Sequence, residues 1–310
     1  MYLADWIQLA RWRDWFQSKL PFITAGALLL APPDAHPLTI VQMMVTVAFW
    51  AAFGYGVNDI ADRRADGRAG KANRAAQISL ASRTLFLLFT AGGALTLCLL
   101  WAGDAAAPGF LVAGLVMAFA YSVRPIRLKE RGVWGLLAAG TAQWGFPILA
   151  VSAAEPGGWL RPAAWLLSVL GLAIGLRWMA VHQLQDAAAD RRADVRTYAS
   201  SGADVWPVIV CAFVLETGAL SAVLLLGWPM SQPALFALAC WALWRALLRC
   251  PPGSFRTRLR GYGEAPLSEY YFLMLPLALA LSRVSSSYGF LGIAALLLLV
   301  GAPHVSRMLR

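Results

Sequence analysis

The chain has 310 residues, of which 59% are hydrophobic and 14% are charged, and it contains 14 tryptophans. Soluble domains use about 25% charged residues, so this composition excludes an ordinary soluble protein and indicates an integral membrane protein. The net charge of +10 does not indicate a nucleic-acid-binding protein, because membrane proteins collect Lys and Arg in their cytoplasmic loops.

The first predicted element covers residues 1–16 and is rich in aromatic and basic residues, among them Trp6, Arg11, Trp12 and Trp15. No small-residue cleavage site follows a short apolar core, so we expect no signal peptide. The composition favours an amphipathic helix that lies in the membrane interface. A simple extension of the first spanning helix fits the same residues equally well.

Ten apolar stretches follow, and each is a candidate spanning helix because about 20 helical residues cross the roughly 30 Å hydrocarbon core. They cover residues 17–33, 38–57, 84–103, 108–123, 133–153, 162–185, 204–227, 232–248, 267–283 and 288–306. No shift in composition divides the chain into soluble domains. We therefore predict a single all-α domain over residues 1–310, a transmembrane bundle of nine or ten spans in which 288–306 is the additional one.

The distribution of basic residues predicts the orientation of this bundle. With a cytoplasmic N-terminus, 23 of the 26 Lys and Arg residues fall in segments on the inner side, while Arg161 and Arg283 fall outside and Arg177 lies within a span. Inner loops of membrane proteins carry this excess. We expect a multi-pass protein of a bacterial-type inner membrane, with its acidic motifs on the cytoplasmic side.

The first acidic motif follows the second predicted span. Asp59, Asp62 and Asp66 are spaced i, i+3, i+7, so on a continuous helix they share one face, with the amide of Asn58 beside them. Cations follow closely at Arg63, Arg64, Arg68, Lys71 and Arg74.

The second acidic motif follows the sixth predicted span, where Asp186, Asp190 and Asp194 are spaced i, i+4, i+8 and again share a helical face. Like charges at this spacing repel, and a divalent cation would offset the repulsion in both motifs. Hard oxygen ligands suit Mg²⁺, which typically uses one or two carboxylates and completes its shell with waters and substrate phosphates.

Arginines interleave with the second motif at Arg191, Arg192 and Arg196. Guanidinium groups pair bidentately with phosphate oxygens, so such a segment can hold metal and diphosphate together. The alternative is that Asp and Arg pair with each other on a solvated loop. Two motifs on one side of one bundle favour the metal and diphosphate site.

Several polar residues within the spans have two interpretations. Arg177 either stabilises an anionic acceptor or forms an ion pair with Glu216, which lies at a comparable depth on the next span. His182, four residues before Asp186, either deprotonates a phenol or orients Asp186. Gln143 and Gln183 either form part of the cavity wall or bond only a neighbouring helix. The cysteines, which have neither metal-site nor disulfide spacing, are expected to be free thiols: Cys98, Cys211, Cys240 and Cys250.

Three motifs in order give the chain a family resemblance that covers most of its length. They are Asn-Asp-x-x-Asp-x-x-x-Asp from Asn58, Asp-x-x-x-Asp-Arg from Asp186, and Tyr121-Ser122-x-x-Pro125-x-Arg127-Leu128-Lys129. Together they resemble the UbiA superfamily of intramembrane prenyltransferases. The resemblance implies a helical bundle, usually of nine spans, around a central cavity capped by cytoplasmic loops. It also implies Mg²⁺-assisted loss of diphosphate from an isoprenyl diphosphate, followed by attack of an acceptor on the allylic cation.

The resemblance assigns roles by position. The implied metal ligands are Asn58, Asp59, Asp62, Asp66, Asp186, Asp190 and Asp194. The residues expected to act in catalysis are Asp59, Asp62, Asp186, Asp190 and Lys129. The residues expected to bind substrate are Asn58, Arg63, Arg74, Tyr121, Arg124, Arg127, Arg177, His182 and Arg191.

Two departures from the family pattern concern loop geometry. Ala75 stands where many relatives have proline after Asn-Arg, which removes a fixed φ, and Asp194 stands where many have glycine, which adds a side chain at a position suited to left-handed backbone. The basic motif also carries Arg124, an additional candidate for a diphosphate contact.

The leading hypothesis is a Mg²⁺-dependent transferase that moves a prenyl group from its diphosphate to a lipophilic acceptor. We expect this acceptor to be aromatic. One alternative is a terpene cyclase of the same superfamily, which needs no acceptor. Another is a non-catalytic isoprenoid-binding membrane protein, although intact Asp motifs argue against it. No nucleic-acid partner is expected.

Overall fold

The computed structural model describes residues 3–32, 34–226, 232–247, 267 and 269–308, and the regular structure in these residues is entirely helical. This confirms the predicted all-α class. The helices are α1 (Leu3–Leu9), α2 (Trp12–Trp15), α3 (Lys19–Leu30), α4 (Pro37–Ala69), α5 (Leu80–Trp101), α6 (Ala106–Ser122), α7 (Val133–Gly140), α8 (Phe146–Ser152), α9 (Pro162–Arg192), α10 (Trp206–Leu226), α11 (Gln232–Leu247), α13 (Leu275–Ser282) and α14 (Gly289–Met308). Short 3₁₀ turns are η1 (Leu128–Glu130) and η3 (Gly158–Leu160), and π-helical turns are η2 (Thr141–Gly145) and η4 (Tyr270–Met274).

Each of the ten apolar stretches contains helix. Among the described residues, four helices are long and apolar enough to cross a membrane, namely α4, α5, α9 and α10, and shorter apolar helices accompany them. The chain is therefore an integral membrane protein. A total of nine or ten spans stays a prediction.

The helices α4 and α9 extend well past the ends predicted for their spans. The apolar stretches end at residues 57 and 185, whereas the helices continue to Ala69 and Arg192 and so include most of both acidic motifs. The 33 residues of α4 measure about 50 Å at 1.5 Å per residue, more than the roughly 30 Å hydrocarbon core. Its end comes only at Gly70, which adopts the left-handed cap at φ 69°.

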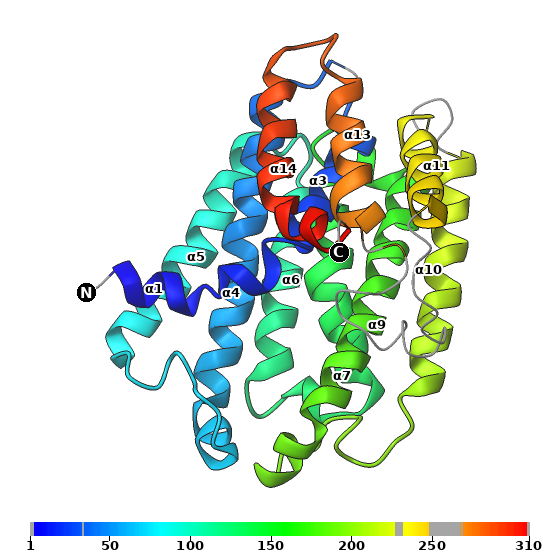
Figure 1. Ribbon diagram of the computed structural model, residues 1–310. Coiled ribbons are helices and arrows are strands. Elements are labelled where there is room, and N and C mark those ends of the chain that lie inside the picture. The colour runs from blue at the N-terminus through cyan, green and yellow to red at the C-terminus, as the bar shows by residue number, and fades with distance from the viewer. Residues whose placement is uncertain (1–2, 33, 227–231, 248–266, 268, 309–310) are drawn as a thin grey trace.

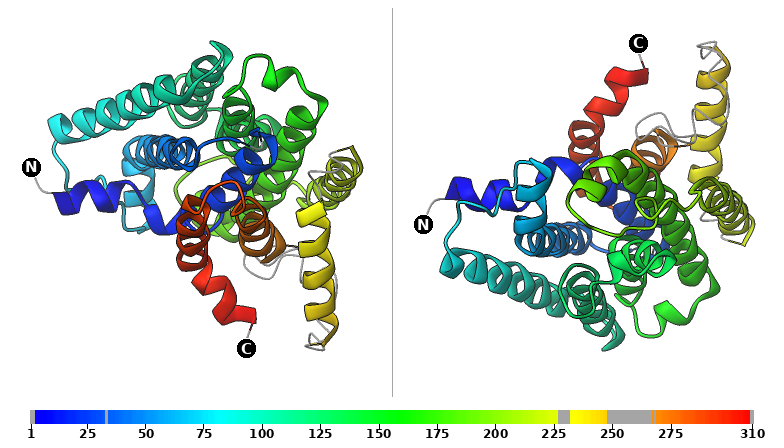
Figure 2. Two further views of the ribbon diagram at one scale, coloured as in Figure 1. Left: turned by 90° about the horizontal axis from the view of Figure 1, so that it is seen from above. Right: turned by 90° about the horizontal axis from the view of Figure 1, so that it is seen from below.

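These two long helices form the centre of the bundle. α4 packs against α5, α9 packs against α10, and α4 and α9 also contact each other. Their C-terminal ends lie at the same end of the molecule, at the bottom of Figure 1, and both views of Figure 2 show α4 beside α5. The two acidic motifs, 120 or more residues apart in sequence, are thereby brought to one end of one bundle.

The π-helical turn η2 interrupts what would otherwise be one helix from Val133 to Ser152. Turns of this kind insert an extra residue and are frequent at functional sites. Trp144 lies in this turn and packs closely on Gly175 of α9, where a β-carbon would come within 2.6 Å of the indole. The glycine is needed for this close approach.

The N-terminal segment that begins with α1 lies across α4 and α5 (Figure 1). Trp6 of α1 packs on Phe86 and Phe89 of α5, and its indole nitrogen donates a hydrogen bond to Ser82. The chain turns between α1 and α2 at Arg11, whose φ is 50°. The predicted interfacial position of this segment remains a prediction.

Cys98 and Cys211 are free thiols, as predicted. The side chain of Cys240 and the whole of Cys250 lie outside the described residues, as do several basic residues used to predict the orientation: Arg249, Arg256, Arg258, Arg260 and Arg310.

Candidate active site

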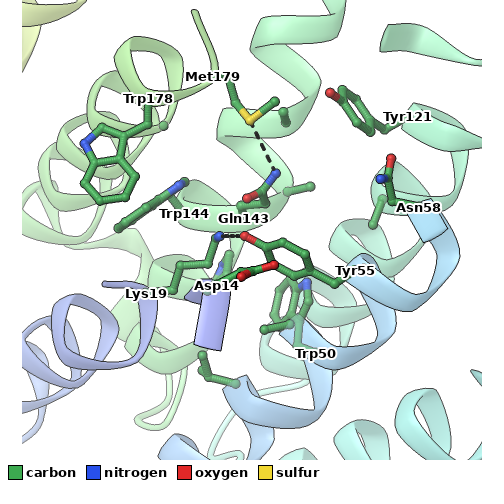
Figure 3. Close-up of a pocket in the computed structure, with 18 of the residues that line it drawn as sticks. Asp14, Lys19, Trp50, Tyr55, Asn58, Tyr121, Gln143, Trp144, Trp178 and Met179 are labelled. Carbon is green, nitrogen blue, oxygen red and sulfur yellow. Dashed lines mark hydrogen bonds between the residues drawn. The ribbon is translucent and has the colours of Figure 1, made fainter. Parts of the chain in front are cut away.

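A cavity of about 390 Å³ lies inside the bundle, lined by residues of the N-terminal segment and of α3, α4, α6, α7, η2, α8 and α9. Three tryptophans, Trp50, Trp144 and Trp178, contribute much of its apolar wall (Figure 3). The polar wall includes four residues singled out from the sequence, namely Asn58, Tyr121, Gln143 and His182. Asp62 and Asp186 follow Asn58 and His182 by four residues each, so both acidic motifs begin at the polar end of this cavity.

In the first motif, Asp59 is buried, with 4% of its surface exposed. Its Oδ1 accepts a hydrogen bond from Arg11 at 3.0 Å, and Arg74 lies 3.9 Å from Oδ2. Oδ2 itself is buried without a hydrogen-bond donor. Asp66, about two turns further along α4 than Asp59, accepts a hydrogen bond from Asn73 at 2.6 Å.

Asp62 holds the loop that follows α6. It accepts hydrogen bonds from Lys129, and from Arg127 at 3.1 Å. Lys129 also donates to Asn58 at 3.3 Å, while Arg127 pairs with Glu130 at 2.5 Å. Burial lowers the pKa of the Lys129 ammonium below its ordinary value, and the negative charge of Asp62 opposes that shift.

The second motif lies opposite, on α9. Asp186 accepts a hydrogen bond from Lys71 at 2.9 Å and lies 3.9 Å from His182. Asp190 accepts a hydrogen bond from Thr197 at 3.2 Å. Lys129 is close enough to interact electrostatically with both Asp62 and Asp190. Acidic and basic side chains therefore alternate where the two motifs approach each other.

Asp194, also predicted as a metal ligand, lies apart from this face. Helix α9 ends at Arg192, and Asp194 follows the end with φ 54° and an exposed side chain. It lies instead in a separate surface hollow of about 800 Å³, together with Arg124 and Arg196. The i, i+8 spacing would have placed it on the face only if the helix had continued for another turn.

Arg177 also departs from its predicted role as a substrate-binding residue. Its guanidinium forms a two-pronged ion pair with Glu216, at 2.8 and 3.0 Å, and the residues are 1% and 0% exposed. It does not line the cavity. The structural alternative, an ion pair between α9 and α10, is confirmed.

The other predicted basic contacts lie at the periphery. Arg191 is exposed, Arg63 is half-buried, and neither lines the cavity. Arg124 is exposed and lies 3.9 Å from Glu130. Of the predicted diphosphate-binding cations, Arg127 and Lys129 are therefore the two that contact the first motif directly, with Arg74 more distant.

The donor atoms suit Mg²⁺, although among the described residues no three acidic, His or Cys side chains already form a metal cluster. Tyr121 and Lys129 each interact electrostatically with both Asp62 and Asp190, so carboxylates of the two motifs lie near one another, and Asp59 has one buried oxygen without a hydrogen-bond donor. Mg²⁺ needs only one or two carboxylates when a substrate supplies phosphate oxygens. The residues present fit a Mg²⁺ ion that arrives with a diphosphate.

Sequence reasoning missed several residues that line the cavity or contact the motifs, namely Arg11, Asp14, Lys19, Tyr55 and Asn73. The rarity of lysine is a signal that points to Lys19, because the chain contains only three lysines compared with 23 arginines. All three are at this site: Lys19 lines the cavity, Lys71 contacts Asp186 and Lys129 contacts Asp62.

Comparisons with known proteins agree with the motifs. A model of the UbiA prenyltransferase family matches residues 19–254. No curated protein matches the sequence.

Solved structures share the fold at low sequence identity. A digeranylgeranylglyceryl phosphate synthase gives a TM-score of 0.62 at 16% identity, covering 91% of this chain and 99% of that one. A UbiA homologue from Archaeoglobus fulgidus bound to GPP and Mg²⁺ gives 0.57 at 14% identity, covering 94% and 99%. The same organism's UbiA homologue bound to DMAPP and Mg²⁺ gives 0.51 at 16% identity, covering 96% and 99%.

Proposed function

Because this chain belongs to the UbiA prenyltransferase family and is therefore a prenyltransferase, we propose that it moves a prenyl group from an isoprenyl diphosphate to a lipophilic acceptor, with Mg²⁺ as cofactor. The observation that carries the proposal is the meeting of two acidic helices and a buried Arg127–Lys129 loop at the polar end of an aromatic cavity. The Archaeoglobus fulgidus homologues, bound to GPP or DMAPP with Mg²⁺, support the same class of donor.

In this proposal the acidic motifs hold Mg²⁺ through Asn58, Asp59 and Asp62 on α4 and through Asp186 and Asp190 on α9. When bound, the ion neutralises the charge that develops on the leaving diphosphate. Arg127 and Lys129, which both donate hydrogen bonds to Asp62, would also bind this diphosphate. Cations now paired with the motifs, such as Arg11 and Lys71, then become available to the diphosphate.

The cavity supplies the rest of the reaction environment. An allylic cation left by departing diphosphate must be kept from water until the acceptor attacks it. Trp50, Trp144 and Trp178 line the cavity, and aromatic faces attract cations. His182 lies beside Asp186 at the polar end and is placed to receive the proton that the acceptor loses. The motifs and the cavity mouth are proposed to face the cytoplasm.

The experiment that tests the proposal is incubation of purified protein with geranylgeranyl diphosphate and Mg²⁺, with and without a phenolic acceptor. Release of diphosphate coupled to a prenylated acceptor supports the transferase. A cyclic hydrocarbon formed without acceptor would instead identify a terpene cyclase. If the protein binds the diphosphate but turns it over under none of these conditions, the result would identify a non-catalytic isoprenoid-binding protein.

Lys129→Ala is expected to weaken diphosphate binding more than the chemical step. The ammonium is buried against Asp62 and Asn58, where it adds a charge-assisted hydrogen bond to a bound anion, an interaction worth about 1.5–3 kcal/mol. The KM for the prenyl diphosphate should rise about 10- to 100-fold. Steady-state kinetics measure this, with Arg131→Ala as an exposed basic control in the same loop. An unchanged KM for Lys129→Ala would remove the lysine from the diphosphate site.

A further inference from the structure

A hollow on the surface of the protein takes no part in the proposed reaction. It measures about 800 Å³ and shares no lining residue with the cavity. The loop between α6 and α7 lines one side, and residues that follow the end of α9 line the other. We propose that this hollow binds the phosphate of an anionic phospholipid headgroup, with Arg124 and Arg196 as the residues that pair with the phosphate.

The charge of the hollow favours an anion. Four arginines line it, and only two acids, Glu130 and Asp194, oppose them. Glu130 already forms an ion pair with the buried Arg127 at 2.5 Å. Arg131 donates a hydrogen bond to the Ile126 carbonyl at 3.3 Å, so its guanidinium is engaged with the loop backbone. Two arginines therefore remain to receive a ligand.

Those two arginines, Arg124 and Arg196, extend from opposite sides of the hollow. The side chain of Arg124 is 77% exposed, and the nearest oxygen of Glu130 is 3.9 Å away, at the outer limit of an ion pair. Arg196 is exposed, and within the described part of the chain it makes no ion pair. Guanidinium groups pair bidentately with phosphate oxygens. A phosphate in the hollow would therefore neutralise two cations that the protein itself leaves unneutralised.

The helices beside the hollow indicate a lipid rather than a soluble phosphate. Helix α6 carries an exposed apolar stripe with i, i+4, i+7 spacing, which in a membrane protein faces lipid: Val112, Val116 and Phe119. This stripe ends five residues before Arg124. Beyond the loop, α7 begins at Val133 with Trp134, which is 66% exposed. Tryptophan is enriched at the level of the lipid headgroups, so the loop that lines the hollow lies between two helices at that level.

The wall of the hollow also suits the glycerol and upper acyl region of a lipid. Pro125 and Ile126 line it together with the arginines, and Ile126 is half exposed although it is apolar. Arginine side chains near the ends of spanning helices extend to the headgroups. An anionic lipid would thus place its phosphate between the arginines and its apolar part against Ile126.

The same loop contacts the acidic motif from its other side. Arg127 lines the hollow and also donates a hydrogen bond to Asp62 at 3.1 Å, and Lys129 bonds the same carboxylate. A lipid phosphate in the hollow and the first acidic motif therefore lie on opposite sides of one loop. The lipid would hold this loop from the membrane side.

The test counts lipids bound to the purified full chain by native mass spectrometry. Dioctanoyl phosphatidylglycerol is compared with dioctanoyl phosphatidylcholine, which has the same acyl chains and no net charge. Each basic residue near an anionic lipid surface strengthens binding about fivefold, so the first phosphatidylglycerol should bind at least tenfold more tightly than the first phosphatidylcholine. A third arm adds inorganic diphosphate without Mg²⁺. Displacement of the bound lipid by an equal concentration of diphosphate would identify a site for soluble anions and overturn the proposal.

Arg124→Gln and Arg196→Gln should each weaken the binding of phosphatidylglycerol about fivefold, and the double variant should bind the two lipids to within about twofold. The matched control is the double variant Arg64→Gln with Arg192→Gln, which removes two exposed arginines that do not line the hollow. This control should keep the preference.

Thermal unfolding in detergent without added lipid should be the same for all these variants and the wild type, because the substituted side chains are exposed. Equal binding of the two lipids by the wild type would overturn the proposal. So would an undiminished preference in the Arg124 and Arg196 double variant, an equal loss in the control, or a double variant that unfolds without lipid, since the last result would give the arginines a structural role.

Discussion

Asp62→Asn should abolish Mg²⁺-dependent release of diphosphate while leaving the protein folded. Asp62 is the shared partner of Lys129 and Arg127 and is the first-motif carboxylate that joins them to α4. The amide has no negative charge, so it weakens the metal site and leaves Lys129 without its ion-pair partner, while Arg127 keeps Glu130. Loss of one such electrostatic contact in an active site typically costs about 100- to 1000-fold in rate. The measurement is inorganic diphosphate released from saturating geranylgeranyl diphosphate.

The matched control is Asp194→Asn, the same chemical change in the second motif. Asp194 lies beyond the end of α9, exposed and outside the cavity. Asparagine also tolerates its left-handed backbone, so the loop should keep its conformation. Diphosphate release should stay within about twofold of wild type. Full activity in Asp62→Asn, or equal losses in both variants, would refute the division between these two aspartates.

This contrast also shows how far periodicity predicts a site. The i, i+3, i+7 spacing of the first motif needs a continuous helix, and α4 supplies one because its first helix-ending glycine is Gly70. The same reasoning fails at Asp194, since no proline or glycine announces the end of α9 at Arg192. The end depends on tertiary contacts instead, such as the hydrogen bond from Arg68 to the Ala193 carbonyl.

The site residues that the sequence does not predict are those that only the fold brings together. Arg11 and Asp59 are 48 positions apart and belong to segments whose relative placement no local pattern specifies. In the sequence, Lys19 is one more basic residue beside an apolar stretch. Only the fold brings it into contact with Tyr55 and Trp144 in the cavity. The ion pair of Arg177 with Glu216 is predictable from the sequence, because each is an isolated charge deep in an apolar span and each can neutralise the other.

Glu216→Gln is expected to destabilise the protein strongly. It leaves the Arg177 guanidinium, which is 1% exposed, without its counter-ion in the interior between α9 and α10. Removing one partner of a buried ion pair costs about 3–5 kcal/mol, because the remaining charge stays desolvated. That is a large part of the stability of a typical domain. Thermal unfolding of the detergent-solubilised protein should show a clearly lowered midpoint and a low yield of folded protein.

The double variant Arg177→Met with Glu216→Leu distinguishes a structural pair from a functional one. Removing both charges removes the desolvation cost along with the attraction, and such replacements of buried ion pairs are often neutral or stabilising. The double variant should therefore recover most of the stability lost in Glu216→Gln and should retain acceptor binding, since Arg177 does not line the cavity. A stable double variant that no longer binds the acceptor would return the substrate-binding role to Arg177.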